Sequence, residues 1–168
     1  EVAKQIFNGA KNLTDDLVAM NLALINGEID AYFTGGTYTA SPARLDGTKN
    51  IRGITPNSGP MGGKGGIVWI ELTSVVNNPN PTPLAEDFLE YVQRPDVSKK
   101  VAFAEGTYNP VTQMGTQEVL STFSKEELDA IQWDSLEQEM ANSVDYDINP
   151  DYAEMYELYS AAKRERKT

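Results

Sequence analysis

The sequence predicts an α/β fold in which a small mixed sheet is flanked by helices and followed by a mostly helical C-terminal portion. A helical pattern over 14–25 runs directly into the β-type run Ile29–Phe33, which ends at Gly35-Gly36. A helix that leads into a strand closed by paired glycines is typical of α/β proteins. Strong β-formers recur over 67–72, and beyond residue 84 the apolar residues follow helical spacing.

The first segments are predicted to be helical. A short helix is expected over 2–10, and a second begins at Thr14, which we expect to be the N-cap with Asp15 and Asp16 in the first turn. Asn26-Gly27 ends this helix.

The middle of the chain mixes short elements with glycine. A short helix is expected over 38–45 and a brief strand over 51–54. The glycines of 56–66 predict a tight turn or hinge, and 67–72 predicts a strand. Only three or four strands are visible in all, so we expect part of the sheet to lie outside this chain.

The rest of the chain is predicted to be helical. Helices are expected over 84–92 and 95–103, after the proline-rich loop 77–83. Ser124 to Glu127 forms a predicted capping box, and a last helix begins at Pro150.

Composition narrows the classes of function. The 168 residues include 25 acidic and 14 basic ones, a net charge of -11, which disfavours nucleic acid and anionic lipid and attracts cations. Cys and His are both absent, so thiolate zinc sites and histidine-based catalysis are excluded. No apolar run is long enough to span a membrane. Enzymes that act through carboxylates, Lys or Tyr remain open.

Two common ligand-binding motifs, the phosphate-binding loop and the calcium loop, are not present in full. Lys64 follows glycines but is followed by Gly65 and a predicted strand, whereas a phosphate-binding loop needs Ser or Thr and then a helix. Asp145, Asp147 and Asp151 lack the spacing of a calcium loop. No cofactor and no metal are expected.

Trp69 and Glu71 form the most informative local pattern. Residues two apart in a strand point to the same face, so an indole and a carboxylate are expected to project together just after the glycine-rich segment. A ring beside a carboxylate suits an organic ammonium ion. The alternative is a core Trp69 with Glu71 at the surface of a strand edge.

Several segments together resemble the type II periplasmic binding proteins, and in particular the spermidine/putrescine-binding branch. Leu24 to Phe33 resembles the family's helix-to-strand passage, and Thr34 to Tyr38 resembles the turn that it places against its ligand. Gly63 to Glu71 is similar to its glycine-rich entry into an aromatic-x-acid strand, and Gly106 to Val111 to a Gly-Tyr-x-x-Pro-like segment.

This resemblance implies a partial type II periplasmic-binding-protein fold whose N-terminal lobe is absent. Residues 1–62 would be the remainder of the second α/β lobe, 63–76 the hinge and ligand-facing strand, and 77–168 the mostly helical C-terminal portion. Family members usually have Asp where this chain has Glu71, so a different cation length or a different amine is implied. The ligand-binding residues that the resemblance implies are Trp69, Glu71, Phe33, Gln132, and either Tyr108 or Thr107.

The function so implied is solute capture for ABC-type import in the periplasm. A small organic cation such as putrescine or spermidine would bind between two lobes and pass to a membrane permease, without catalysis, membrane insertion or nucleic acid. Copies of the chain could also associate over the uncovered lobe surface. Two alternatives stay open: the same fold with a sugar or another amine as ligand, and a carboxylate-based hydrolase or acidic interaction domain.

Overall fold

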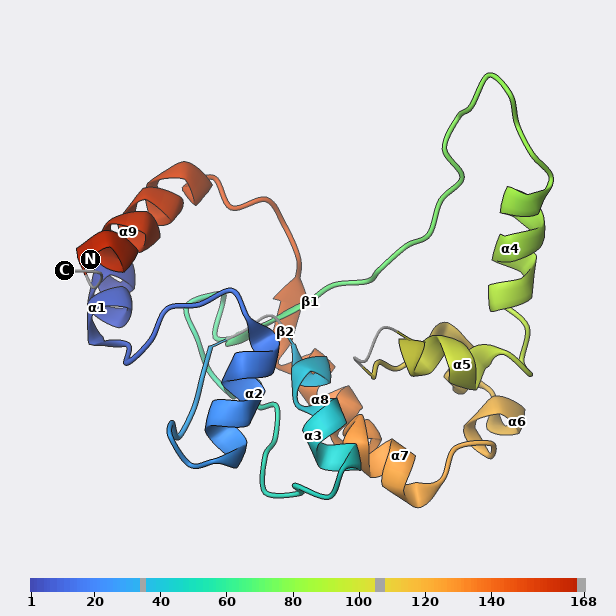
Figure 1. Cartoon of the computed structure of the whole chain (residues 1–168), viewed down its shortest axis with the longest axis horizontal. Coiled ribbons are helices and arrows are strands. Elements are labelled where there is room, and N and C mark those ends of the chain that lie inside the picture. Colours follow the sequence, from blue (N-terminus) through green and yellow to red (C-terminus); the bar gives the residue numbers. More distant parts are fainter. Residues whose placement is uncertain (34–35, 105–107, 166–168) are drawn as a thin grey trace. The chain divides into compact units, whose positions relative to one another are not determined.

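The computed structural model describes residues 1–33, 36–104 and 108–165. The chain is a mixed α/β protein, about 48% helical, with a small two-stranded parallel sheet (Figure 1). Its residues group into two compact units. Glu1–Tyr32 and the chain from Tyr146 onward make up the terminal unit, and Phe33–Asp145 makes up the central unit.

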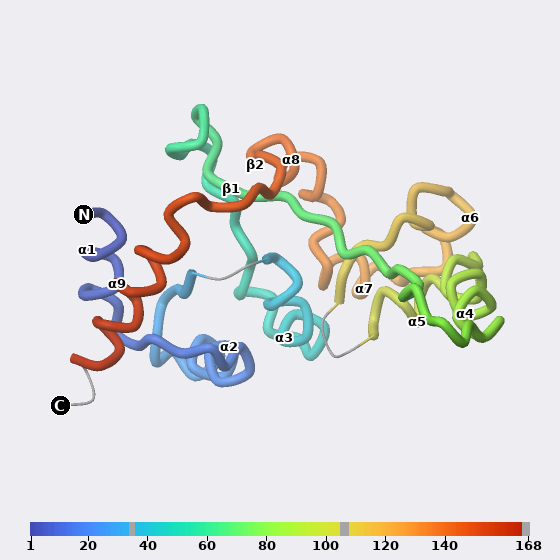
Figure 2. Tube along the Cα trace, turned by 90° about the horizontal axis from the view of Figure 1, so that it is seen from above, coloured from blue at the N-terminus to red at the C-terminus, as the bar shows by residue number. Residues whose placement is uncertain are grey.

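The described part of the terminal unit contains three helices, α1 (Val2–Gly9), α2 (Leu17–Ile25) and α9 (Tyr152–Glu165). Figure 2 shows α1 beside α9, where the rings of Phe7 and Tyr159 meet edge to face with their centroids 5.6 Å apart. This contact joins the two ends of the sequence.

The N-cap of α2 differs from the prediction. Asp16 is the cap, and its carboxylate accepts a hydrogen bond from the N–H of Ala19 at 3.0 Å. Thr14 lies two residues before the cap, where its hydroxyl accepts the N–H of Asp16 at 3.1 Å. Asp can reach the third N–H of a helix as well as Thr can. The predicted end is confirmed, because Gly27 follows the helix with φ of 70°.

The central unit carries the sheet. β1 (Gly66–Val68) pairs in parallel with β2 (Ser143–Asp145), with Gly66 opposite Ser143. The helix α8 (Leu136–Ala141) contacts both strands. Before β1, Met61 and Lys64 form an isolated antiparallel bridge across Gly62 and Gly63. These two glycines have φ of 64° and 89°, a conformation that confirms the predicted tight turn.

The remaining elements of the central unit are short helices. The predicted helix over 38–45 is present as a 3₁₀ turn, Thr37–Thr39, and α3 (Ser41–Leu45). α4 (Leu84–Val92) has the predicted bounds, and α5 (Ser98–Ala102) is shorter than predicted. The 3₁₀ helix Thr112–Gly115, α6 (Gln117–Leu120), α7 (Lys125–Ala130) and the 3₁₀ helix Trp133–Ser135 follow.

The predicted strands are the main errors. Ile29–Phe33 and residues 51–54 are not strands, and the predicted strand over 67–72 is reduced to β1. A β-type sequence forms a strand only where a neighbouring strand accepts its hydrogen bonds. Gly53, for example, bonds the side chain of Gln132 instead.

Two interior features hold the central unit together. Its apolar core consists of Ala102, Met114, Val119, Phe123 and Ile131. Arg44 of α3 is only 4% exposed, and its guanidinium donates two hydrogen bonds to the carbonyl oxygen of Asp129 in α7. No described helix has the length and apolar character that crossing a membrane requires.

Candidate functional site

Trp69 lies against an aromatic ring from a distant part of the central unit. β1 ends at Val68, and the indole of the next residue meets the ring of Tyr38 edge to face, with centroids 5.6 Å apart and planes at 89°. Trp69 remains 38% exposed. Edge-to-face contact is a preferred geometry for aromatic pairs, so Tyr38 holds the indole while part of it stays accessible.

The 3₁₀ turn Thr37–Thr39 positions Tyr38. Its ring folds back over the backbone of Gly36, and a Cβ at that position would collide with the ring. Any larger residue at position 36 would displace the Tyr38 ring from this position. The turn that the family resemblance singled out thus contributes a ring to Trp69.

Glu71 is exposed, two residues beyond Trp69. No hydrogen bond or ion pair joins its carboxylate to any residue that the structure describes. Because β1 ends at Val68, no pairing with a neighbouring strand fixes the side-chain alternation from Trp69 to Glu71. Their shared face therefore stays a prediction.

Phe33 and Tyr108 have different surroundings. Phe33 is 92% exposed, whereas Tyr108 is half-buried, with its ring edge to face with Phe103 at 4.7 Å. The backbone carbonyl of Tyr108 accepts the Ser41 hydroxyl at 3.1 Å. Thr107 lies outside the described residues. Tyr108 is thus anchored beside the core, whereas the ring of Phe33 is almost fully exposed.

Gln132 supports the backbone of a neighbouring segment. Its amide NH₂ donates to the carbonyl of Gly53 at 2.9 Å, and its amide oxygen accepts the N–H of Gly53 at 2.7 Å. The residue is 2% exposed and has φ of 56°. Both ends of the amide are therefore used within the fold, and nothing in the local sequence pattern indicated this role.

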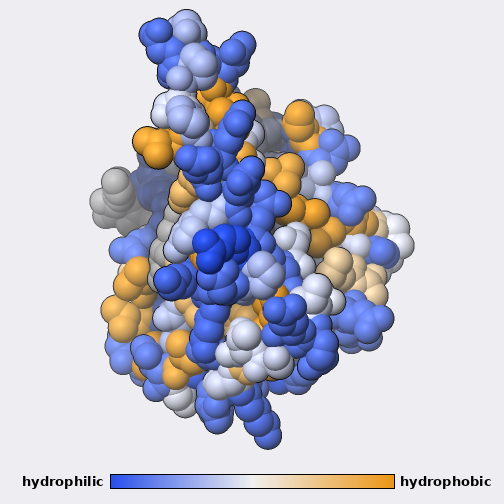
Figure 3. Space-filling view, turned by 90° about the vertical axis from the view of Figure 1, so that its right-hand side faces the viewer, coloured by the Kyte–Doolittle hydropathy of each residue, from blue (hydrophilic) through white to orange (hydrophobic). Residues whose placement is uncertain are grey.

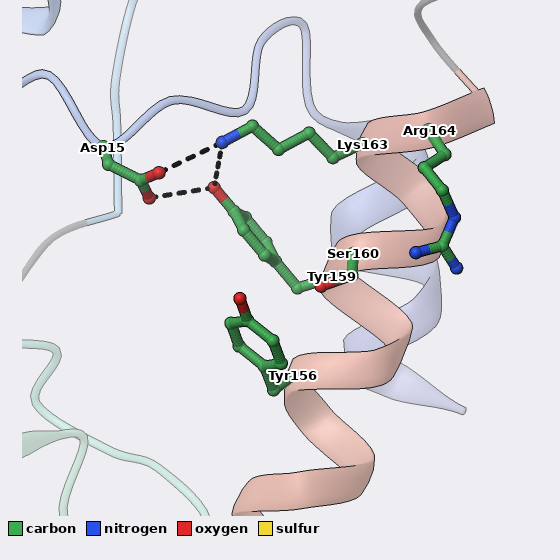
Figure 4. A pocket seen from close by; sticks show the side chains of 6 residues that line it. All are labelled: Asp15, Tyr156, Tyr159, Ser160, Lys163 and Arg164. Carbon is green, nitrogen blue, oxygen red and sulfur yellow. Dashed lines mark hydrogen bonds and ion pairs between the residues drawn. The ribbon is translucent and has the colours of Figure 1, made fainter.

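A second polar cluster, missed by sequence reasoning, lies in the terminal unit. Lys163 donates to Asp15 at 3.0 Å, and the Tyr159 hydroxyl donates to the same carboxylate at 3.1 Å (Figure 4). Tyr159 and Lys163 are four residues apart on α9, a spacing that places both on one helix face. With Tyr156, Ser160 and Arg164 they line a pocket of about 270 Å³.

Charge pairing within this cluster shifts both titrating groups. The hydrogen bond from Lys163, followed by the bond from Tyr159, lowers the pKa of Asp15 below its usual value. The hydrogen bond to Asp15 in turn raises the pKa of Lys163. Both groups are therefore charged at neutral pH and largely satisfy each other.

Metal binding has no support in the described parts of the chain, where no three Asp or Glu residues lie close enough together to hold an ion. Comparison with known protein families, with curated proteins and with solved structures finds no match to this chain. The resemblance to periplasmic binding proteins therefore rests on the sequence motifs alone.

Proposed function

We propose that this chain is the C-terminal part of a periplasmic solute-binding protein that captures a small organic cation, such as putrescine or spermidine, for ABC-type import. The observation that carries the proposal is the Tyr38–Trp69 pair, a fixed and partly exposed indole followed two residues later by a carboxylate that has no partner among the described residues. The proposed protein binds its ligand between two lobes, passes it to a membrane permease, and performs no chemistry.

Each part of a polyamine has a matching group here. Its methylene chain would lie on the indole of Trp69, and one ammonium would hydrogen bond to Glu71. A cation beside an aromatic ring contributes about 0.5–2 kcal/mol, depending on desolvation, and a hydrogen bond between charged groups about 1.5–3 kcal/mol. Since Tyr38 already fixes the ring, little conformational entropy is lost there on binding.

The charge of the chain supports the same class of ligand. A net charge of -11 attracts cations over a long range. The exposed ring of Phe33 in the same unit would supply a second aromatic wall. Tyr108 is assigned a supporting position, because its ring packs on Phe103.

Tryptophan fluorescence tests the proposal directly. The only other tryptophan is Trp133, so a Trp133→Phe background makes Trp69 the sole reporter. We expect putrescine and spermidine at millimolar concentration to change its emission, whereas glucose at the same concentration and salt of matched ionic strength leave it unchanged. Calorimetric titration of the unsubstituted chain provides a check that does not depend on the background substitution.

Two glutamate variants distinguish binding of the amine at Glu71 from attraction of cations by the net negative charge of the chain. Glu71→Gln should weaken amine binding roughly 10- to 100-fold, since it removes one hydrogen bond between charged groups. Glu90→Gln makes the same charge change at an exposed position of α4 and should have no such effect. Equal weakening in both variants, or binding of glucose without binding of amines, would refute the assignment to organic cations.

A further inference from the structure

A second groove lies in the central unit, apart from Trp69 and Glu71. It has a volume of about 330 Å³ and lies between the extended segment 73–78 and α4. All of the described residues that line it fall within 73–89, one continuous stretch of chain. Its apolar walls come from Val75, Val76, Pro81, Ala85, Phe88 and Leu89.

The exposed face of α4 extends this apolar surface. Leu84, Phe88 and Tyr91 are 71%, 55% and 42% exposed, and no residue of α4 is buried. Their spacing of four and then three residues places them in one stripe along the helix. On the side of the molecule that carries α4, hydrophobic patches lie at the surface among hydrophilic residues (Figure 3).

The exposed area of the whole chain is large for its mass. The chain exposes 12231 Å² at 18.5 kDa, whereas a compact protein of this mass exposes roughly 8,200 Å². Two separate domains with the sizes of the two units would still expose only roughly 9,800 Å². The difference is larger than the ~800 Å² that a standard interface buries on each partner. This excess is larger than a single standard interface with the second lobe of the proposed solute-binding protein would cover, so it leaves surface for contact with another molecule.

The charges around the groove define the chemistry of that molecule. Residues 73–92 contain three carboxylates, Glu86, Asp87 and Glu90, and no Lys or Arg. Glu86 lines the groove itself, and neither it, Asp87 nor Glu90 has an ion pair with any described residue. A second copy of the chain would bring like charges together, which disfavours it as the occupant.

We propose that this groove and the adjoining face of α4 dock an amphipathic helical segment of a partner protein, with apolar anchors on one face and Lys or Arg beside them. An anchor side chain fills the groove between Val76 and Phe88, and basic side chains pair with Glu86 and Glu90. This arrangement is a helix-in-groove contact with complementary charge. It is independent of the amine site, since the groove includes neither Trp69 nor Glu71.

Two designed peptides test the proposal on the full chain. One is a helix with leucine along one face and lysine on the other, and its twin has glutamate in place of lysine. Fluorescence anisotropy of the labelled peptides should show binding of the lysine peptide, weakening as salt increases, and no binding of the glutamate peptide. Failure of the lysine peptide to bind overturns the proposal.

Matched variants locate the contact. Phe88→Ala should weaken peptide binding at least about 10-fold, as expected for a central anchor, whereas Tyr156→Ala removes an equally exposed ring from the terminal unit without effect. Glu86→Lys should weaken binding more than Glu118→Lys, the same charge change at an exposed residue of α6. Leu84→Gln provides a second test of the apolar stripe, and circular dichroism verifies folding.

Other outcomes count against the proposal. An equal effect of Glu86→Lys and Glu118→Lys would mean that the acidic chain attracts cationic peptides over its whole surface. Sedimentation that shows a dimer of the chain, lost in Phe88→Ala, would identify a second copy as the occupant instead.

Discussion

Arg44 provides a quantitative test of how the central unit is held together. Its guanidinium donates two hydrogen bonds to the carbonyl of Asp129, one to the carbonyl of Lys49 at 3.0 Å and one to that of Ile51 at 2.7 Å. It also pairs with the Asp129 carboxylate at 3.1 Å. Arg44→Ala removes all of these contacts and leaves the acceptors without their partner.

The size of the effect follows from burial. Each buried acceptor that loses its partner costs about 1–3 kcal/mol, and water entering the space left by the side chain recovers part of this. We therefore expect the free energy of unfolding to fall by about 3–5 kcal/mol. At a urea dependence of about 2 kcal/mol per M, the midpoint of unfolding moves down by roughly 2 M.

The assay is urea unfolding followed by tryptophan fluorescence, because both tryptophans lie in the central unit. Arg94→Ala is the control. Arg94 pairs with Asp96 at 2.6 Å, but both side chains are more than half exposed, so the midpoint should hardly move. Asp129→Asn should cost less than Arg44→Ala, because the backbone carbonyl stays in place. Equal midpoints for Arg44→Ala and Arg94→Ala would refute the reasoning.

Two further predictions concern pH. Burial raises the pKa of Glu127, but the hydrogen bonds from Lys99 and from the N–H of Ser124 outweigh it and leave the pKa below its usual value. The ionised Glu127 carboxylate therefore stabilises the folded chain fully at a pH above the ordinary glutamate pKa. This stabilisation is lost as the pH falls through the lower pKa that Glu127 has in the folded state. Glu127→Gln keeps an acceptor for the Ser124 N–H and removes the ion pair with Lys99, so it should destabilise the chain at neutral pH by about 0.2–1 kcal/mol. Urea unfolding at acid pH should show no difference from the unsubstituted chain, and a difference that persists there would contradict this. In the terminal unit, the Asp15 carboxyl should titrate below its usual pKa by NMR and return toward that value in Lys163→Met, because Lys163 is the main cause of the shift; an unchanged pKa in the variant would show that the ion pair does not form.

Local sequence signals predicted the helices well. The bounds of α4 were predicted correctly, and the capping box at Ser124 is present, with the Ser124 hydroxyl accepting the N–H of Glu127 at 3.2 Å. Helical hydrogen bonds join residues four apart, so the information for them is contained within a short window of sequence.

The candidate site was predicted in part. The sequence pattern singled out Trp69 and Glu71, and the family resemblance pointed to the turn that contains Tyr38. The contact between Tyr38 and Trp69 joins positions 31 residues apart in the sequence, and no periodicity could reveal it. The bonding of Gln132 to Gly53 is likewise invisible in the local pattern.

The sequence by itself determined the composition of the chain, its net charge of -11, the absence of Cys and His, and most of the helices. Only the tertiary structure decided which β-type segments became strands, because β1 exists where Ser143–Asp145 lies beside it and Ile29–Phe33 has no such neighbour among the described residues. The physical reason is the distance in sequence between the bonded groups. A helix forms its backbone hydrogen bonds within itself, whereas a strand, a buried arginine or an aromatic pair depends on partners from distant parts of the chain.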